Sequence, residues 1–451
     1  MQGINAPSVQ EDPSSKESLR KQIGFFGLTM IAAGSCIGSG IFITPSDVAD
    51  QLGNTTAVLL VWLWGGVVAI TGSLTFAELA ARFPDAGGVY IYIRECFGRL
   101  LAFLYGWCIL TVITSGAIAA LSLTFARYLS VLIPLSNIGQ IIVGISAIAA
   151  VTLINVLGVK PGEVFSSVFT LFKLVGLSGI IVAGILIGRA IPETPVNIGT
   201  IDTFPGIGAF ALAMIGVLWS YGGWHHASYV AAETKGATRI VPRAMILGTL
   251  IVTATYMLAN YAYLRLLPLE TLASSQAVAS DALKSVLPIG AMLVTLLIAI
   301  STFGSIGIYT LTAPRIYYSM ARDGSFFRAI AKLHPRHQTP IWAISIQSGW
   351  AVVLLLFWTT FENLMTYVVF MDWVFMTLAA LSIFYFRKKF AALPATGFRT
   401  PLYPIIPLVF IGISVWFVAY TLIGKPAQAW GGIVLLLAGL PVYYFSRKKE
   451  I

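Results

Sequence analysis

Long apolar runs alternate with short polar segments along the chain from residue 23 to residue 446. A helix that crosses a bilayer needs about 20 consecutive apolar residues, and runs of this length predict twelve transmembrane helices. We expect these helices over residues 23–47, 56–81, 98–125, 137–157, 162–188, 206–232, 241–265, 287–319, 340–360, 363–386, 403–424 and 428–446. The pattern therefore predicts an all-α polytopic membrane protein, and an even number of spans places both termini on one side of the membrane.

The composition favours a membrane protein over a soluble one. Charged residues make up 10% of the chain, whereas they make up about 25% of soluble domains. Hydrophobic residues make up 57%, and the mean hydropathy of +0.86 is too high for a single core surrounded by water. Residues 1–22 are polar and lack the pattern of a cleavable signal. We therefore predict a short N-terminal tail over 1–22 and a C-terminal tail over 447–451.

The net charge of +10 could indicate a nucleic-acid partner, but the positions of the basic residues argue against one. If both termini are cytoplasmic, 22 of the 28 Lys and Arg residues lie in cytoplasmic segments. The basic residues of the outer segments are Arg127, Arg189, Arg265, Lys284 and Lys425. This asymmetry follows the positive-inside rule. It predicts cytoplasmic termini, a location in the plasma membrane (the inner membrane of the cell) and no nucleic-acid partner.

The first predicted helix contains a stretch that is unsuited to a continuous helix, from Gly34 to Ser46. Gly34, Gly38 and Gly40 lie within seven positions, and each glycine costs a helix about 1 kcal/mol relative to alanine. A helix break within a membrane is tolerated where the freed backbone groups face a cavity or a ligand. The N-terminus of the second half-helix would carry unpaired N–H groups suited to an anion, as in transporters built on broken helices. Small residues that merely allow close helix packing are the alternative.

The sixth predicted helix contains a second interruption, at the pair Gly222-Gly223 with large aromatic residues on both sides. The two breaks occupy equivalent positions if helices 1–5 and 6–10 form two repeats, over residues 23–190 and 206–390. The last two helices, over 400–446, would follow these repeats. Paired interruptions at corresponding positions are the best indication from sequence of a binding site near the middle of the membrane.

Lys173 lies about a dozen residues from each end of the fifth predicted helix. A charge at this depth costs roughly 3 kcal/mol, so it indicates a functional site by default. About 18 Å of helix separates it from either end, which is too far for the side chain to reach water. We predict that its amine takes the place of a sodium ion at the site. Ser301, Thr302 and Ser305 could face it, although such hydroxyls also bond their own helix backbone.

Arg315 and Arg322 lie near the inner end of the eighth predicted helix. Pairing with Glu233 or Glu78 would form a gate on the cytoplasmic side. Anchoring of the two arginines at the lipid headgroups is the competing interpretation.

His225 and His226 could suggest a metal or haem, but neighbouring residues on a helix do not share a face. The other histidines, His334 and His337, lie in a predicted cytoplasmic loop, so we predict no metal and no cofactor. A hydrogen-bonding or proton-linked role for His225 and simple packing both remain possible readings. Asp372 lies near the middle of the tenth helix, and its possible partners are the helix-5 lysine, a pocket histidine or a cationic substrate.

Several motifs occur in the order and spacing of a known family. The chain resembles the amino acid–polyamine–organocation superfamily, and within it the L-type amino acid transporter branch, from about residue 23 to residue 399. The resemblance rests on Gly38-Ser-Gly-Ile-Phe, Glu78…Pro84-Asp-Ala-Gly-Gly-Val-Tyr, Ser220-Tyr-Gly-Gly-Trp and Met320-Ala-Arg-Asp-Gly. It implies a LeuT-type fold of two inverted five-helix repeats plus two helices. It also implies sodium-independent amino acid transport, usually by obligatory exchange.

The resemblance also implies the roles of individual residues. The amides around Gly38, Ser39 and Gly40 would hold the α-carboxylate of the substrate, and carbonyl groups near Ile37 and in the second break would accept its amino group. The predicted substrate-binding residues are Ile37, Gly38, Ser39, Gly40, Trp219, Ser220, Gly222, His225 and Asp372.

Two further roles follow from the same resemblance. Trp219 corresponds to the aromatic gate of the family on helix 6. Lys173 corresponds to the helix-5 lysine of the branch at the vacated sodium position, with Ser301 or Ser305 opposite.

The sequence departs from the pattern of the branch at three positions near the side-chain pocket. Asparagines that the branch often has there are replaced by His225, Gly307 and Asp372, which affects the identity of the substrate rather than transport itself. Residues 129–140, the outer loop after helix 3, contain no cysteine. Animal members use a cysteine there to link a heavy chain, so we expect no such disulfide partner and a monomer or homodimer.

We therefore predict a sodium-independent amino acid transporter, and specifically an exchanger that works by alternating access. Proton-coupled transport of amino acids, or transport of amines or polyamines, is the alternative. A membrane-embedded enzyme would need a metal site or a nucleophile–base arrangement, and the four histidines supply neither. Two broken helices and an intramembrane lysine fit a transporter, which occludes its substrate, better than they fit a channel with an open pore.

Overall fold

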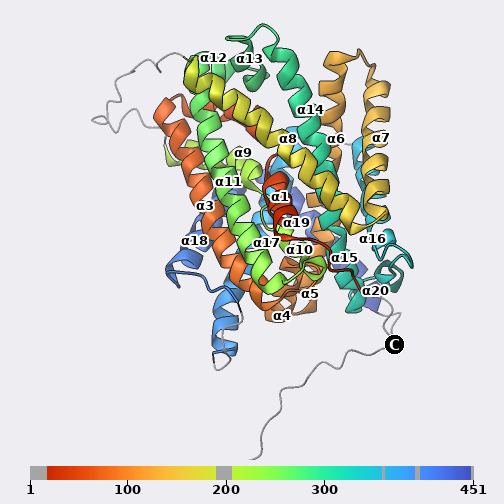
Figure 1. Cartoon of the computed structure of the whole chain (residues 1–451). Helices are drawn as coiled ribbons and strands as arrows, with labels where there is room; N and C mark the ends of the chain where they lie inside the picture. The colour runs from red at the N-terminus through yellow and green to blue at the C-terminus, as the bar shows by residue number, and fades with distance from the viewer. Residues whose placement is uncertain (1–17, 189–205, 358–360, 392–396, 448–451) are drawn as a thin grey trace, which may run out of the picture.

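The computed structural model describes residues 18–188, 206–357, 361–391 and 397–447, and these residues are mainly α-helical (Figure 1). The described part contains no β-strand, only an isolated parallel bridge between Ile23 and Thr234. Most of the two predicted tails, residues 1–17 and 448–451, lies outside the described residues. Arg189, which we expected in an outer segment, also lies outside them.

Within the described residues, nine helical stretches are long and apolar enough to cross a membrane. They are Phe25–Leu52, Thr55–Arg82, Arg99–Leu132, Asn137–Val156, Val159–Leu186, Ala237–Leu266, Gly290–Arg322, Val368–Lys389 and Ile405–Gly424. Three shorter apolar helices are Ile207–Tyr221, Ile341–Phe357 and Ala429–Phe445. Each of the twelve predicted segments overlaps with one of these stretches.

The first and sixth predicted helices are interrupted, as their glycines indicated. The first consists of α1 (Phe25–Cys36) and α2 (Gly40–Leu52). The sixth consists of α9 (Ile207–Tyr221) and the short α10 (His226–Tyr229), followed by a 3₁₀ turn. Both interruptions therefore leave backbone groups without a partner in their own helix, in the interior of the bundle.

Three other predicted helices contain irregularities that we did not predict. The third consists of α5 (Arg99–Cys108), a π-helical turn and α6 (Thr114–Leu132). The eighth divides into α14 (Gly290–Thr312) and α15 (Pro314–Arg322), because proline has no N–H to continue the hydrogen-bond ladder. The twelfth divides into α19 (Pro426–Leu437) and α20 (Gly439–Arg447). In addition, α6 extends past the predicted end at residue 125, so Arg127 lies in a helix rather than in a loop.

Short helices mark the two ends of the bundle (Figure 1). Two helices that we did not predict, α12 (Leu269–Ser274) and α13 (Val278–Lys284), lie at one end. At the opposite end, α4 (Val89–Phe97) lies with α15, and we call this end the α4–α15 end. The Ser46 hydroxyl of α2 donates to the Ser275 carbonyl at 2.7 Å and also lies 3.0 Å from the Ala273 carbonyl, which holds the α12 segment against α2.

The helix α1 lies in the interior, where it packs against α8 (Val159–Leu186), α11 (Ala237–Leu266) and α14. All of its residues from Gly27 to Cys36 are buried. A Cβ atom at Gly34 would lie 1.9 Å from the Thr170 hydroxyl, so this glycine serves close helix packing.

Five further helices complete the bundle around this interior. They are α3 (Thr55–Arg82), α7 (Asn137–Val156), α16 (Ile341–Phe357), α17 (Phe361–Lys389) and, beside α3 and α17, α18 (Ile405–Gly424). The Glu78 carboxylate of α3 accepts two hydrogen bonds from the Arg387 guanidinium of α17 and one from the Thr400 amide. Glu78 therefore holds the segment before α18 in place. It was one of the two acidic partners that we considered for the gate, but it does not pair with Arg315 or Arg322.

Candidate functional site at the two helix breaks

The break between α1 and α2 exposes backbone N–H groups at the start of α2. Ile37 and Gly38 leave the helix, and Ser39 occupies the N-cap position without a capping bond from its side chain. The amides of Ser39, Gly40 and Ile41 donate to no acceptor in the part of the chain that the structure describes. The Ser39 hydroxyl is also buried without a hydrogen-bond partner there. A cluster of unpaired donors at a helix N-terminus is suited to an anion such as a carboxylate.

The carbonyl groups on the other side of this break are already paired. Five consecutive carbonyls at the end of α1 each accept a hydrogen bond from a side chain of another helix. The pairs are Gly34 with Lys173 at 2.9 Å, Ser35 with Tyr309 at 3.0 Å, Cys36 with Tyr256 at 2.9 Å, Ile37 with Ser305 at 3.2 Å and Gly38 with Ser301 at 3.0 Å. The first break therefore presents more unsatisfied donors than unsatisfied acceptors.

Lys173 lies directly behind the first break. Its side chain is fully buried, and Nζ donates to the Gly34 carbonyl and, at 2.6 Å, to the Ser305 hydroxyl. Ser305 is therefore the hydroxyl in contact with the lysine, while Ser301 bonds the Ile37 and Gly38 carbonyls instead. Thr302 bonds the carbonyl of Ile298 in its own helix, which is the alternative that we considered for it.

The break between α9 and α10 lies against the first one. Gly223 has a φ of +123°, a region that only glycine adopts without strain. A Cβ atom there would lie 2.7 Å from the backbone of Ser35, whose hydroxyl donates to the Gly223 carbonyl at 2.8 Å. Gly40 lies equally close to Ser220. The glycines thus allow two backbones to touch in the middle of the bundle.

Tyr256 of α11 connects the two breaks, and the sequence analysis did not identify it. Its fully buried hydroxyl lies 2.9 Å from the Cys36 carbonyl and 3.0 Å from the Ser220 carbonyl. One phenol hydrogen can be donated to only one acceptor at a time, so the hydroxyl lies within reach of a carbonyl at the end of each half-helix and bonds one of the two. The only signal in the sequence was a polar side chain within an apolar span.

A small cavity of about 40 Å³ adjoins the second break. It has room for roughly three water-sized groups, at about 10–15 Å³ each. Predicted site residues on its wall are Trp219, Gly222, His225 and Asp372. Ile37, Gly38, Ser39, Gly40 and Ser220 do not line it. Of these residues, Gly40 and Ser220 are in contact with each other between the two breaks.

Asp372 projects one carboxylate oxygen, Oδ1, that is shielded from solvent and has no hydrogen-bond partner among the described residues. Of the partners that we considered, Lys173 forms no ion pair with it in this part of the chain, whereas both pocket histidines share its cavity. The ring of His226 is held by Thr312, with Nδ1 and the hydroxyl 2.7 Å apart. His225 contributes to the cavity wall itself.

An ion pair between Arg315 and Glu233 lies towards the α4–α15 end. Two hydrogen bonds of 2.7 and 2.9 Å join the side chains, which are 0% and 1% exposed. The Glu233 carbonyl also accepts from the amides of Gln22 and Ile23, which lead into α1. This cluster therefore joins α15, the segment after α10 and the start of α1. Arg322 does not take part; it lies over the ring of Tyr318.

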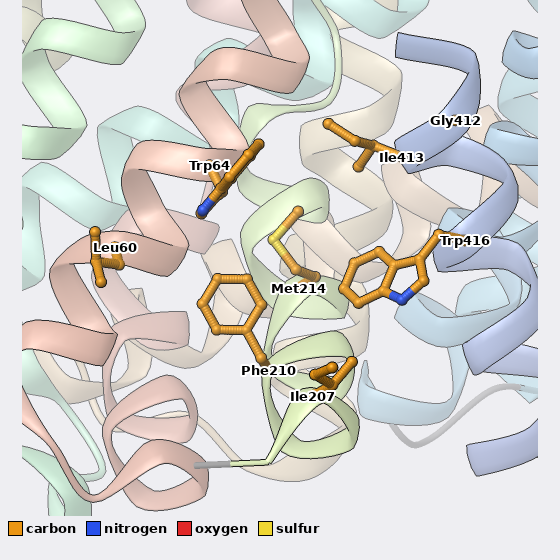
Figure 2. Close-up of a pocket in the computed structure, with 8 residues that line it drawn as sticks. All are labelled: Leu60, Trp64, Ile207, Phe210, Met214, Gly412, Ile413 and Trp416. Carbon is orange, nitrogen blue, oxygen red and sulfur yellow. The ribbon is translucent and has the colours of Figure 1, made fainter. Parts of the chain in front are cut away.

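A larger groove of about 400 Å³ lies away from this site, between α3, α9 and α18 (Figure 2). Its wall is formed by Leu60, Trp64, Ile207, Phe210, Met214, Gly412, Ile413 and Trp416. None of these residues is charged and none belongs to the predicted site. A zwitterionic ligand would find no ionic partner there, so the groove is not a second candidate for the substrate site. Among the described residues there is also no cluster of potential metal ligands.

The apolar helices, the paired breaks and the buried ionic groups define a polytopic membrane protein of the amino acid transporter class. The chain belongs to the amino acid permease family, whose model matches residues 23–441, and it lies in the L-type branch of the amino acid–polyamine–organocation superfamily.

Three relatives illustrate this relationship. The chain is 32% identical over 437 residues to the serine/threonine exchanger SteT of Bacillus subtilis (strain 168), covering 96% of this chain and 98% of the relative. It is 30% identical over 441 residues to the Asc-type amino acid transporter 1 of Homo sapiens, covering 96% and 83%. It is also 30% identical over 458 residues to the large neutral amino acids transporter small subunit 2 of Mus musculus, covering 98% and 85%.

Proposed function

We propose that this protein exchanges small neutral amino acids across the plasma membrane by alternating access and without sodium. The proposal includes a LeuT-type arrangement of two inverted repeats, over residues 23–190 and 206–390, with residues 400–446 following them. In this arrangement all twelve apolar segments cross the membrane, and both termini and the α4–α15 end face the cytoplasm. The excess of basic residues in the segments on that side supports this orientation.

One observation carries the proposal. The amides of Ser39, Gly40 and Ile41 lack partners in the described structure, while the five preceding carbonyls have them. Unpaired buried N–H groups cost free energy until an acceptor reaches them. We assign the α-carboxylate of the substrate to these amides. Its amino group would donate to carbonyls near Ile37 and at Trp219 and Ser220.

Lys173 supports independence from sodium. Its amine already contacts the Gly34 carbonyl and the Ser305 hydroxyl, and oxygens of this kind are the ligands that a hard cation requires. A fixed ammonium group there supplies the positive charge that a bound ion would otherwise bring. The site then needs no cation from solution to hold the first break together.

The size of the cavity and the relatives support a small substrate. A cavity of about 40 Å³ leaves little room for a long side chain, and one relative is named a serine/threonine exchanger. Oδ1 of Asp372 lacks a partner in the described structure, so it could accept a hydrogen bond from a substrate hydroxyl. We therefore propose serine and threonine as the first substrates to test, with Trp219 closing the site.

The proposal is tested with purified protein in liposomes that contain either unlabelled amino acids or none. Labelled serine, leucine, glutamate and lysine are offered outside, with and without sodium and a pH gradient. Uptake of serine that requires internal amino acid and ignores both gradients is the expected result. Uptake into empty vesicles that follows the pH gradient would replace exchange by proton coupling, with His225 and Asp372 as the groups to examine.

Cationic substrates are the remaining alternative, and the buried carboxylate of Asp372 is the observation that favours them. Uptake of lysine or an amine in preference to serine would establish this alternative. We further propose that the protein needs no disulfide-linked subunit, because residues 129–140 contain no cysteine. Migration on a gel that does not change on reduction is the expected result.

A further inference from the structure

A polar cleft of about 640 Å³ opens at the α4–α15 end. The residues that line it are far in sequence from those of the two helix breaks. Its wall includes three arginines from three different elements: Arg99 begins α5, Arg322 ends α15, and Arg328 begins a 3₁₀ turn. All three side chains are exposed. Nothing in the proposed transport mechanism uses these three arginines.

The one acidic side chain on this wall is already engaged. Asp323 accepts hydrogen bonds from the Tyr90 hydroxyl at 2.6 Å and from the Arg94 guanidinium at 2.9 Å. Burial and the neighbouring Asp323 carboxylate raise the pKa of Tyr90, so this phenol remains a donor. Burial disfavours the charge on Arg94, but hydrogen bonds to Asp323 and Glu95 outweigh it and raise the pKa of Arg94. Asp323 is therefore already bound by Tyr90 and Arg94, and its ion pair is with Arg94 rather than with an arginine that lines the cleft.

The backbone around the cleft adds to this positive character. The helix α5 has ten residues and begins at Arg99, which lines the cleft, so the N-terminal end of this helix, with its partial positive charge, adjoins the cleft. The carbonyls at the end of α15 do not offset this effect, because the amides of Asp323, Gly324 and Ser325 already bond to them. The local charge is therefore positive from side chains and backbone alike.

Two exposed aromatic residues flank the arginines. Phe97, which is 37% exposed, lies two residues before Arg99, and Phe327, which is 49% exposed, lies immediately before Arg328. Exposed aromatic rings beside basic residues are typical of the boundary between lipid and water. Phosphate groups of phospholipids occupy this level of a bilayer.

We propose that this cleft binds a phosphate group, which Arg99, Arg322 and Arg328 hold together. Guanidinium groups are suited to phosphate because they donate paired hydrogen bonds in a planar fork. The source is either the headgroup of an anionic phospholipid or free phosphate, and the experiment separates the two. Bound phosphate would link α5, α15 and the 3₁₀ turn, and so stabilise the same end of the bundle as the Arg315–Glu233 pair.

The test measures the thermal unfolding of the full-length protein in a neutral maltoside detergent. Short-chain phosphatidic acid, short-chain phosphatidylcholine and inorganic phosphate are each titrated. Phosphatidic acid should raise the unfolding temperature, whereas phosphatidylcholine, which has no net charge, should not. The same rise with inorganic phosphate would identify the free anion as sufficient, and a rise with phosphatidic acid alone would identify a lipid headgroup.

Two triple variants make the result specific. One basic residue near an anion contributes about fivefold in affinity, so Arg99→Gln/Arg322→Gln/Arg328→Gln should raise the half-saturating concentration by at least about tenfold. The control Lys235→Gln/Arg239→Gln/Arg243→Gln removes the same charge from exposed positions that do not line the cleft and should change it by less than about threefold. Equal effects of the two triples, or equal stabilisation by phosphatidylcholine, would overturn the proposal.

If the triple variant at the cleft folds poorly, the single variant Arg99→Gln gives the same test with a smaller expected change of about fivefold. These measurements do not depend on transport. A phosphate site that is absent would leave the proposed exchange activity untouched, and inactive protein could still bind phosphate.

Discussion

Gly40 and Ser220 are in direct contact, so that a Cβ atom added at Gly40 would lie 2.3 Å from the Ser220 hydroxyl oxygen and 3.0 Å from its Cα atom. The hydroxyl could rotate away, but the Cα atom belongs to the backbone just before the second break. Gly40 is also the first residue of α2, where the unpaired amides lie. The contact therefore couples the proposed carboxylate site to the position of α9.

This contact predicts that Gly40→Ala lowers transport at least about fivefold, since forcing a methyl group into a packed interior typically costs about 1–3 kcal/mol. The matched control is Gly38→Ala. A Cβ atom there meets nothing closer than 3.7 Å, so its transport should stay within about threefold of the parent. Exchange of labelled serine in liposomes measures both. Equal losses in the two variants would mean that the amides, and not the contact with Ser220, determine the effect.

Replacement of the buried lysine should abolish transport without preventing insertion. In Lys173→Ala, the Gly34 carbonyl and the Ser305 hydroxyl lose their shared donor, and the first break loses the charge that we assign to the place of a cation. Exchange should fall more than about tenfold, because an unsatisfied buried acceptor costs about 1–3 kcal/mol. Size-exclusion chromatography in detergent checks that the variant is folded.

Lys284→Ala removes an exposed lysine. It is the control that separates the loss of the buried amine from the loss of any one lysine. If Lys173→Ala exchanged amino acids at the parental rate, the assigned role of Lys173 would be wrong.

Tyr256→Phe should weaken substrate affinity while leaving the fold intact. The change removes the one hydroxyl that reaches carbonyls of both breaks, and a lost hydrogen bond of this kind costs about 0.5–1.5 kcal/mol. We expect KM for exchange to rise roughly two- to tenfold. Tyr263→Phe is the control on the same helix, because that buried hydroxyl has no partner among the described residues. A similar rise in KM in both variants would show that the bridge to the breaks is not what matters.

The breaks themselves could be predicted from the sequence because their cause is local. Glycine is costly in a helix, and the glycine clusters Gly38–Gly40 and Gly222–Gly223 lie at the two observed breaks. The prediction was broader than the observed break, since Gly34 lies inside α1 and makes room for Thr170. Both interpretations of the small residues therefore apply, each to a different glycine.

The partners across the bundle could not be predicted in the same way. The hydroxyl of Tyr256 reaches carbonyls of both breaks only because α11 packs against them. A single tyrosine in an apolar span does not indicate this packing. Glu78 was a reasonable partner for Arg315 by charge and depth alone. The structure pairs it with Arg387 because α17 and the segment before α18 lie next to α3. Contacts between distant segments depend on topology rather than on local pattern.

The Arg315–Glu233 pair leads to a prediction that separates stability from transport. Removing one partner of a buried ion pair leaves an uncompensated charge, which typically costs about 3–5 kcal/mol. We therefore expect Glu233→Met to lower the unfolding temperature in detergent clearly. Replacing both residues, in Arg315→Met/Glu233→Met, removes both charges and should recover most of the stability, because apolar side chains of similar size often substitute well for a buried pair.

Recovered stability should not restore exchange. The pair joins α15 to the turn after α10, and the carbonyl of Glu233 also holds the segment that leads into α1. Suppose that this cluster closes the α4–α15 end during the transport cycle. In the double variant that end would then either stay closed or fail to close firmly. In both cases serine exchange will remain low although the protein is stable. Parental exchange in the stable double variant would show that the pair only holds the fold together, and the gate would then have to be sought among other contacts at this end.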